Sequence, residues 1–177
     1  MKIVVAITGA SGSVVGLRLI KELERKGVEV IKLISKMGKK VLEFETKQQL
    51  KPDYDVDDFF VPIASSSQKI DALVICPCSM KTLSAVANGF ANNLIIRVAD
   101  NCLKMKRKLI LCTRETPINL IHIENMKKVT LAGGTIMPLD AAYYSEPKSV
   151  EDMTDFFVGK ILDLLDIEHN LYKRWKG

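Results

Sequence analysis

The sequence contains few of the residues that most often build metal and redox sites. It has only two histidines, His122 and His169, and they lie far apart in the chain. A histidine-rich metal site is therefore excluded, and the cysteines lack the paired spacing of zinc ligands, which leaves a redox or metal role as the lesser interpretation of them. We expect all four to be small core or site-lining residues: Cys76, Cys78, Cys102 and Cys112.

Long apolar runs are also absent, since none reaches the ~18 residues of a membrane span. The N-terminal residues enter an apolar segment directly, without the pattern of a signal peptide. We therefore expect a cytoplasmic protein that binds no membrane. The 177 residues, of which 47% are hydrophobic, are enough for one domain with a full core. We assign residues 1–165 to this domain and residues 166–177 to a C-terminal tail.

The net charge of +5 suits an anionic ligand. The densest basic run, residues 104–108, lacks the interleaved aromatic residues of single-strand nucleic-acid binders. We expect no nucleic-acid partner. Two interpretations of the run remain open: a solvated helix end, or the source of one cation for a phosphate site.

Apolar β-branched runs alternate with segments of helical periodicity, which is typical of βαβ units and a parallel sheet. The pattern predicts strands over residues 2–7, 28–35, 59–63, 71–77, 108–113 and 135–138. It predicts helices over residues 13–27, 36–46, 80–104 (with a break near Gly89), 118–133 and 149–165.

A glycine-containing loop, TGASGSVVG at residues 8–16, lies between the first predicted strand and helix. Such a loop can hold the pyrophosphate of a dinucleotide, the phosphate of a flavin, or only a tightly packed turn. Its GxxGxxxG spacing departs from the dinucleotide fingerprint GxGxxG. The second predicted strand is followed by Ser35 and Lys36 rather than by a ribose-binding acid. Both differences argue against a dinucleotide.

Several short segments, in the same order along nearly the whole chain, resemble the flavin prenyltransferases of the UbiX family. They are TGASG (8–12), LISK (33–36), ICPCSMKTLSAVANG (75–89), NNLIIRVAD (92–100), TRETP (113–117), HIENM (122–126), YYSEPKSVEDM (143–153) and LYKRW (171–175). The resemblance implies a Rossmann-like (flavodoxin-like) three-layer α/β sandwich with a mostly parallel sheet. It also implies a homododecamer with sites built at subunit contacts.

The resemblance implies an activity as well. Members of the family join a dimethylallyl group from dimethylallyl phosphate to N5 and C6 of reduced FMN, without a metal. The product, prenylated FMN, is a cofactor for UbiD-type decarboxylases. By resemblance, FMN is held by Gly9, Ala10, Ser11, Ser35, Ser79, Met80, Lys81, Thr82 and Arg114. The chemistry agrees, because a mononucleotide phosphate needs hydroxyls, backbone donors and a cation. Helix capping by Ser35, and by Ser79 with Thr82, is an interpretation compatible with this one.

By resemblance, the prenyl phosphate binds Lys104, Arg114, Tyr144 and Lys160. Without a metal, the leaving phosphate needs such charge-assisted donors. The family often has arginine where this chain has Lys160, and lysine keeps the charge but loses the two-pronged contact. The serine-rich loop at residues 64–67 is expected near this site, and Arg97 at its edge or at a subunit contact.

Three residues match catalytic positions of the family: Ser11, Glu45 and Glu115. Ser11 and Glu45 would assist proton movement at the reacting edge of the flavin. Glu115 would protonate the departing phosphate, and we hypothesise that it does so only with substrate bound, since a phosphate dianion favours a protonated carboxyl group. An ordinary ion pair with Arg114 is the structural alternative for Glu115.

Two other functions are weighed against this one. A flavin-dependent cysteine decarboxylase of the same fold would want a histidine early in the chain, and none precedes His122. A non-catalytic flavin carrier would need the FMN loops but not Lys104, Glu115, Tyr144 and Lys160, which are all present.

Overall fold

Five parallel strands form the centre of the computed structural model, which describes residues 1–175. The strands are β1 (Lys2–Ile7), β2 (Glu29–Ile34), β3 (Ala72–Cys78), β4 (Lys108–Thr113) and β5 (Thr135–Ile136). Their order across the sheet is β2-β1-β3-β4-β5. Because all pairs are parallel, every strand ends at the same edge of the sheet, here called the carboxyl edge.

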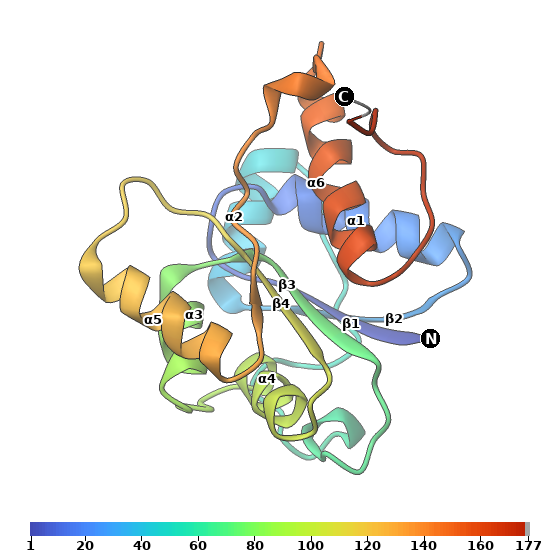
Figure 1. Ribbon diagram of the computed structural model, residues 1–177. Coiled ribbons are helices and arrows are strands. Elements are labelled where there is room, and N and C mark those ends of the chain that lie inside the picture. The colour runs from blue at the N-terminus through green and yellow to red at the C-terminus, as the bar shows by residue number, and fades with distance from the viewer. Residues whose placement is uncertain (176–177) are drawn as a thin grey trace.

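Helices cover both faces of this sheet. They are α1 (Ser13–Arg25), α2 (Lys36–Thr46), α3 (Met80–Ala87), α4 (Leu94–Lys104), α5 (Leu120–Leu131) and α6 (Val150–Leu164). Two 3₁₀ turns, η1 (Pro62–Ala64) and η2 (Tyr143–Ser145), lie in the connections. Figure 1 shows α1 and α6 together on one side of the sheet and α3, α4 and α5 on the other.

The core consists of one apolar cluster on each face of the sheet. Along β1, Ile3, Val5 and Ile7 pack against α1 and α6, whereas Val4 and Ala6 face the cluster of α3 and α4. This alternation explains why β1 and β3 read as continuous apolar runs, since both of their faces are buried. The predicted three-layer α/β sandwich with a parallel sheet is confirmed.

Most predicted elements are present within a few residues of their expected bounds, and the break near Gly89 separates α3 from α4. The strand predicted over residues 59–63 is wrong. Phe59 and Phe60 are exposed, and Pro62 begins η1 instead. Among residues 1–175, no helix is long and apolar enough to cross a membrane.

The C-terminal segment continues past α6 and runs back along that helix. Lys26, directly after α1, donates a hydrogen bond to the carbonyl of Glu168 at 2.5 Å, and His169 is buried. The last two residues of the tail expected from the sequence, 176–177, lie outside the described residues.

The four cysteines are buried free thiols, as expected from the sequence. Burial raises the pKa of the Cys102 thiol to about 12 and raises those of Cys78 and Cys112 well above the ordinary value. Because only the thiolate is reactive, we expect no cysteine of the folded protein to be labelled by a disulfide reagent within minutes. All four should react in guanidinium chloride. Rapid labelling of the folded protein would contradict this assignment.

Candidate functional site

The loops that follow β1, β2, β3 and β4 meet at the carboxyl edge. The Ser35 N–H donates to the Ile7 carbonyl at 3.0 Å, which joins the loops after β1 and β2. Gly9 lies so close to Met37 that an added Cβ would come within 2.5 Å of its Cγ. The Arg114 N–H donates to the Cys78 carbonyl at 3.4 Å. The predicted FMN residues therefore lie in one continuous row, where ligands bind in open parallel sheets.

Thr8 joins the first and third of these loops, a role that sequence reasoning missed. Its buried hydroxyl donates to the Pro77 carbonyl at 2.8 Å and accepts from the Ser79 N–H at 2.9 Å. The sequence does contain a signal for this role of Thr8, because the threonine lies directly after an apolar strand and before a glycine turn.

Ser35 and Ser79 both cap helices that begin at the carboxyl edge. The Ser35 Oγ accepts from the Gly38 N–H at 3.0 Å, and the Ser79 Oγ accepts from the Thr82 N–H at 3.3 Å. The capping interpretation of these serines is confirmed. The first amides of a helix have no partner within the helix, so the amides of α2 and α3 that precede Gly38 and Thr82 remain available to an anion at this edge.

The N-terminus of α1 has a different occupant, the carboxylate of Glu45. Glu45 is the penultimate residue of α2, and its side chain extends to the glycine loop. It accepts from the Gly12 N–H at 3.2 Å, from the Ser13 N–H at 3.0 Å, and from the Ser13 hydroxyl. The glycine loop thus has an anion of the protein's own at the position where a dinucleotide fold holds a pyrophosphate.

Burial raises the pKa of Glu45, but hydrogen bonds from the Ser11 and Ser13 hydroxyls and from the Ser13 and Gly12 amides outweigh it and lower the pKa below 4.5. The stabilisation is therefore complete above pH 4.5 and is lost as the pH falls through the lowered value. We expect Glu45→Ala to lower the melting temperature at pH 7 by about 2 °C, because a helix N-terminus loses its cap. The difference from wild type should shrink below pH 4.

Glu43→Ala is the matched control for this change. Glu43 lies on the same helix, is exposed, and has only a 3.4 Å contact with Gln49. The melting temperature of Glu43→Ala should equal that of wild type at every pH. Equal decreases in the melting temperatures of the two variants would contradict the capping role of Glu45.

Arg114 and Glu115 follow β4 and line a cavity of about 300 Å³ with Pro138 and Leu139. Arg114 Nε and the neighbouring Thr113 hydroxyl are buried and have no hydrogen-bond partner among residues 1–175. An unpartnered buried guanidinium nitrogen fits an anionic ligand. No ion pair joins Glu115 to Arg114 in the described part of the chain, which argues against the structural alternative for Glu115. Its carboxylate accepts from the Thr116 N–H at 3.2 Å.

Tyr144 and Lys160 form a second group, which lies on η2 and α6. The ring of Tyr144 meets that of Phe156 edge-on, with 6.0 Å between centroids. Lys160 lines a cavity of about 370 Å³ together with Phe156 and Phe157. Across residues 1–175, no hydrogen bond or ion pair joins Tyr144 or Lys160 to the loops of the carboxyl edge. The helix itself is fixed to α1 by the Arg18–Asp155 ion pair at 2.8 Å.

Lys104 lies in a third group, at the opposite edge of the sheet. It ends α4 just before β4 begins, whereas Arg114 follows the end of β4. A strand of this length spans about 20 Å, so the two residues of one chain are far apart. The expectation that Lys104 joins Arg114, Tyr144 and Lys160 is not met within a single chain.

The serine-rich loop is held by α4, the helix that ends at Lys104. The Ala64 carbonyl accepts from Arg97 Nε and Asn101 Nδ2, both at 3.0 Å. Arg107 holds the same loop through the carbonyls of Ser66 and Gln68. Part of the basic run therefore has a structural task, and by its spacing Lys104 shares the face of α4 that carries Arg97 and Asn101.

Both histidines have structural contacts. His122 belongs to the capping box of α5, and His169 is buried against Asp163. Among the described residues, no cluster of histidine, cysteine and carboxylates could hold a metal ion.

Comparisons with known proteins agree with this geometry. A family model described as Flavoprotein matches residues 1–174. Flavin prenyltransferase UbiX of Methanocaldococcus jannaschii is 49% identical over 182 residues, covering 99% of this chain and 98% of the relative. The crystal structure of AnUbiX (PadA1) in complex with FMN and dimethylallyl pyrophosphate matches with a TM-score of 0.96 at 40% identity, covering 99% of this chain and 97% of that chain.

Two further structures complete the comparison. A dodecameric FMN-dependent UbiX-like decarboxylase from Escherichia coli O157:H7 has a TM-score of 0.96 at 36% identity and covers 100% of both chains. The FMN-dependent cysteine decarboxylase TvaF has a TM-score of 0.63 at 19% identity, covering 77% of this chain and 88% of that chain, and this likeness shows the fold alone. By full-length identity to its relatives, the chain belongs to the flavin prenyltransferase family.

Proposed function

We propose that this member of the flavin prenyltransferase family transfers the dimethylallyl group of dimethylallyl phosphate to N5 and C6 of reduced FMN. The observation that carries the proposal is the row of loops at the carboxyl edge. There, the helix amides left free by the two serine caps, the serine hydroxyls and the unpartnered Arg114 Nε all fit one mononucleotide. The FMN bound to AnUbiX supports the same conclusion.

The contacts favour one orientation of FMN. Because Glu45 already occupies the N-terminus of α1, the flavin phosphate goes to the N-termini of α2 and α3, near Ser35 and the residues from Ser79 to Thr82. The ring then lies toward the glycine loop, Gly9 to Ser11. When bound, reduced FMN supplies the nucleophilic N5 and C6 atoms.

The roles of the remaining residues follow from their charge and position. Arg114 neutralises phosphate without a metal, and Glu115 donates a proton to the leaving phosphate oxygen. Ser11 and Glu45 accept and carry away the proton released at C6, since the Glu45 carboxylate is held at the same loop.

Lys104, Tyr144 and Lys160 bind the prenyl phosphate only if more than one chain builds the site. Lys104 lies at the far edge of the sheet from Arg114, so we assign it to a neighbouring subunit. The dodecameric relative supports such an assembly. So does α5, which buries Asn125 but exposes four large apolar residues: Leu120, Ile121, Ile123 and Leu131. The prenylated FMN would serve a UbiD-type decarboxylase.

The test is anaerobic incubation of the protein with reduced FMN and dimethylallyl phosphate, followed by mass spectrometry of the released flavin. We expect a mass gain of one dimethylallyl unit. Unmodified FMN, with binding confirmed, would reject dimethylallyl phosphate as the donor. The assay would then be repeated with dimethylallyl pyrophosphate and longer allylic phosphates. Failure of every donor would favour the decarboxylase or carrier functions.

A further inference from the structure

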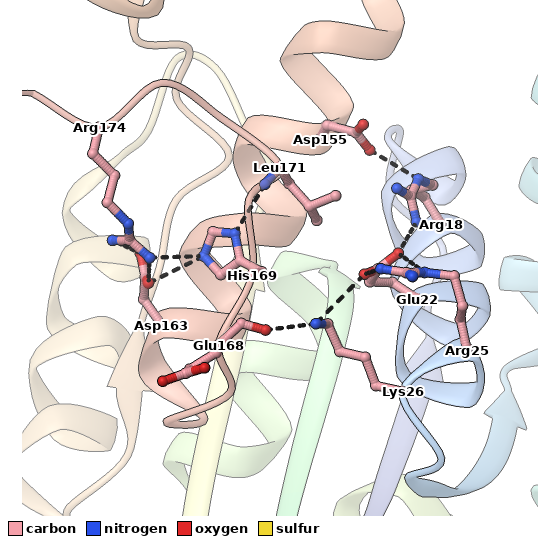
Figure 2. Close-up of polar contacts among 10 residues, drawn as sticks. All are labelled: Arg18, Glu22, Arg25, Lys26, Asp155, Asp163, Glu168, His169, Leu171 and Arg174. Atoms are coloured by element: carbon pink, nitrogen blue, oxygen red, sulfur yellow. Dashed lines mark hydrogen bonds and ion pairs between the residues drawn. The ribbon is translucent and has the colours of Figure 1, made fainter.

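The segment after α6, residues 166–175, is here called the strap, and it is anchored to the helix at Asp163. The Asp163 carboxylate accepts hydrogen bonds from the Tyr172 hydroxyl at 2.6 Å, Arg174 Nη2 at 2.7 Å and His169 Nε2 at 3.1 Å. Because His169 Nδ1 accepts from the Leu171 N–H, the ring proton lies on Nε2 and is donated to Asp163. Figure 2 shows the contacts of Asp163 with His169 and Arg174, beside the contact between Lys26 and Glu168.

Gly159 of α6 leaves room for the strap to pack against the helix. A Cβ on Gly159 would lie 2.5 Å from Cδ1 of Tyr172 and 2.7 Å from Cε1 of His169. The absence of a side chain at this position lets both rings approach the helix backbone. The strap is therefore packed into α6 one residue before Lys160.

The ring of Tyr172 lies near Lys160 and, through Phe156, near Tyr144, two of the four predicted prenyl-phosphate ligands. The Lys160 ammonium lies 5.9 Å from the centroid of this ring. The Phe156 ring lies 5.1 Å from Tyr172 and 6.0 Å from Tyr144, so Phe156 stands between the two tyrosines. Arg174 approaches the Tyr172 ring at 5.4 Å, and its charge is balanced by Asp163.

We propose that Tyr172 is a positioning residue whose ring, held in place by the strap, directs the Lys160 ammonium toward the prenyl phosphate. This inference rests on the proposed function, which gives Lys160 its ligand. Lysine lacks the rigid fork of arginine and has a flexible four-carbon stem. An aromatic face within about 6 Å attracts an ammonium and restricts its direction. The Tyr172 ring therefore restricts the direction of the flexible Lys160 side chain. The more rigid side chain of an arginine at this position would need this restriction less.

The first test observes the contact directly. Lysines are reductively methylated with ¹³C-formaldehyde, and the Lys160 signal is assigned by its loss in Lys160→Arg. A ring face shifts a nearby methyl signal upfield, so we expect an upfield Lys160 signal in wild type and in Tyr172→Phe. The shift should disappear in Tyr172→Leu. An unshifted Lys160 signal in wild type would overturn the proposal, whether or not the protein transfers prenyl groups.

The second test is a double-mutant cycle on the KM for dimethylallyl phosphate. We expect Tyr172→Leu to raise this KM roughly two- to fivefold, the size of a partly exposed cation–π contact, with kcat and the Kd for FMN unchanged. Tyr172→Phe keeps the ring and should match wild type. In a Lys160→Ala background, Tyr172→Leu should have no further effect. A full effect in that background would overturn the proposal, because Tyr172 would then act without Lys160.

The Tyr172→Phe variant separates a positioning role of the ring from a role of the strap in stability. Tyr172→Phe loses the hydroxyl contact with Asp163, so a rise in KM in this variant, with its ring still present, would show that the strap acts through stability and would overturn the proposal. If wild type transfers no dimethylallyl group while its Lys160 signal is shifted, the proposed function fails and the contact of Lys160 with Tyr172 stands.

Discussion

Replacing Glu115 by glutamine is expected to lower the rate of prenyl transfer about 10²- to 10⁴-fold, the usual contribution of a general acid, while FMN stays bound. The amide cannot donate a proton of comparable acidity to the leaving phosphate oxygen. The proposed flavin contacts, at the capped helix starts of Ser35 and of Ser79 to Thr82, are untouched by the change. The measurement is single-turnover transfer from dimethylallyl phosphate under anaerobic conditions, with the Kd for FMN determined separately.

The matched control for this prediction is Glu124→Gln. Glu124 is an exposed carboxylate on α5 with only a 3.6 Å ion pair to Lys127. The rate of prenyl transfer by Glu124→Gln should therefore equal that of wild type. Turnover of Glu115→Gln at the wild-type rate would remove the acid role from Glu115. A rate lost together with FMN binding would mean that Glu115 supports the flavin rather than the leaving group.

Two inactive variants are expected to restore activity when they assemble together. Lys104→Ala and Glu115→Gln each abolish most transfer alone, but the two residues lie at opposite edges of the sheet in one chain. If Lys104 serves a neighbouring subunit, a random equal mixture gives about a quarter of the sites both wild-type residues. The mixture should therefore show about a quarter of wild-type activity after unfolding and co-refolding or co-expression.

The control for this experiment mixes the same two preparations without exchange of subunits, which should leave the activity at the level of the separate variants. A co-assembled mixture that stays inactive would contradict the assignment of Lys104 to a partner.

The fold could be predicted largely from local sequence because its strands are buried on both faces. Runs such as KLILCT appear as β4 with the expected bounds, Lys108–Thr113. The failure at residues 59–63 has the opposite cause. Phe59 and Phe60 read as strand residues, yet both are exposed, and Phe60 is fully so. Apolar residues placed for surface contact carry the same local signal as buried ones.

The site could be predicted only in part, because its contacts join distant segments. The glycine loop and the capping serines have recognisable local patterns, and both are present at the carboxyl edge. The contact of Glu45 with Gly12 and Ser13 joins residues more than thirty positions apart, and no local pattern predicts it. The position of Lys104 could have been predicted from topology alone, since a helix that precedes a parallel strand ends at the amino edge.

The Glu45 carboxylate on the glycine loop has a consequence for ionic strength. This anion and the α1 amides neutralise each other inside one chain, in contact, so dissolved salt screens them little. Arg114, whose buried Nε has no partner among residues 1–175, is proposed to gain its counter-charge from a ligand phosphate. We therefore expect the salt dependence of FMN affinity to report the phosphate end of the ligand. The ring end, proposed to lie beside Ser11, would meet an environment whose charge is already balanced before FMN binds.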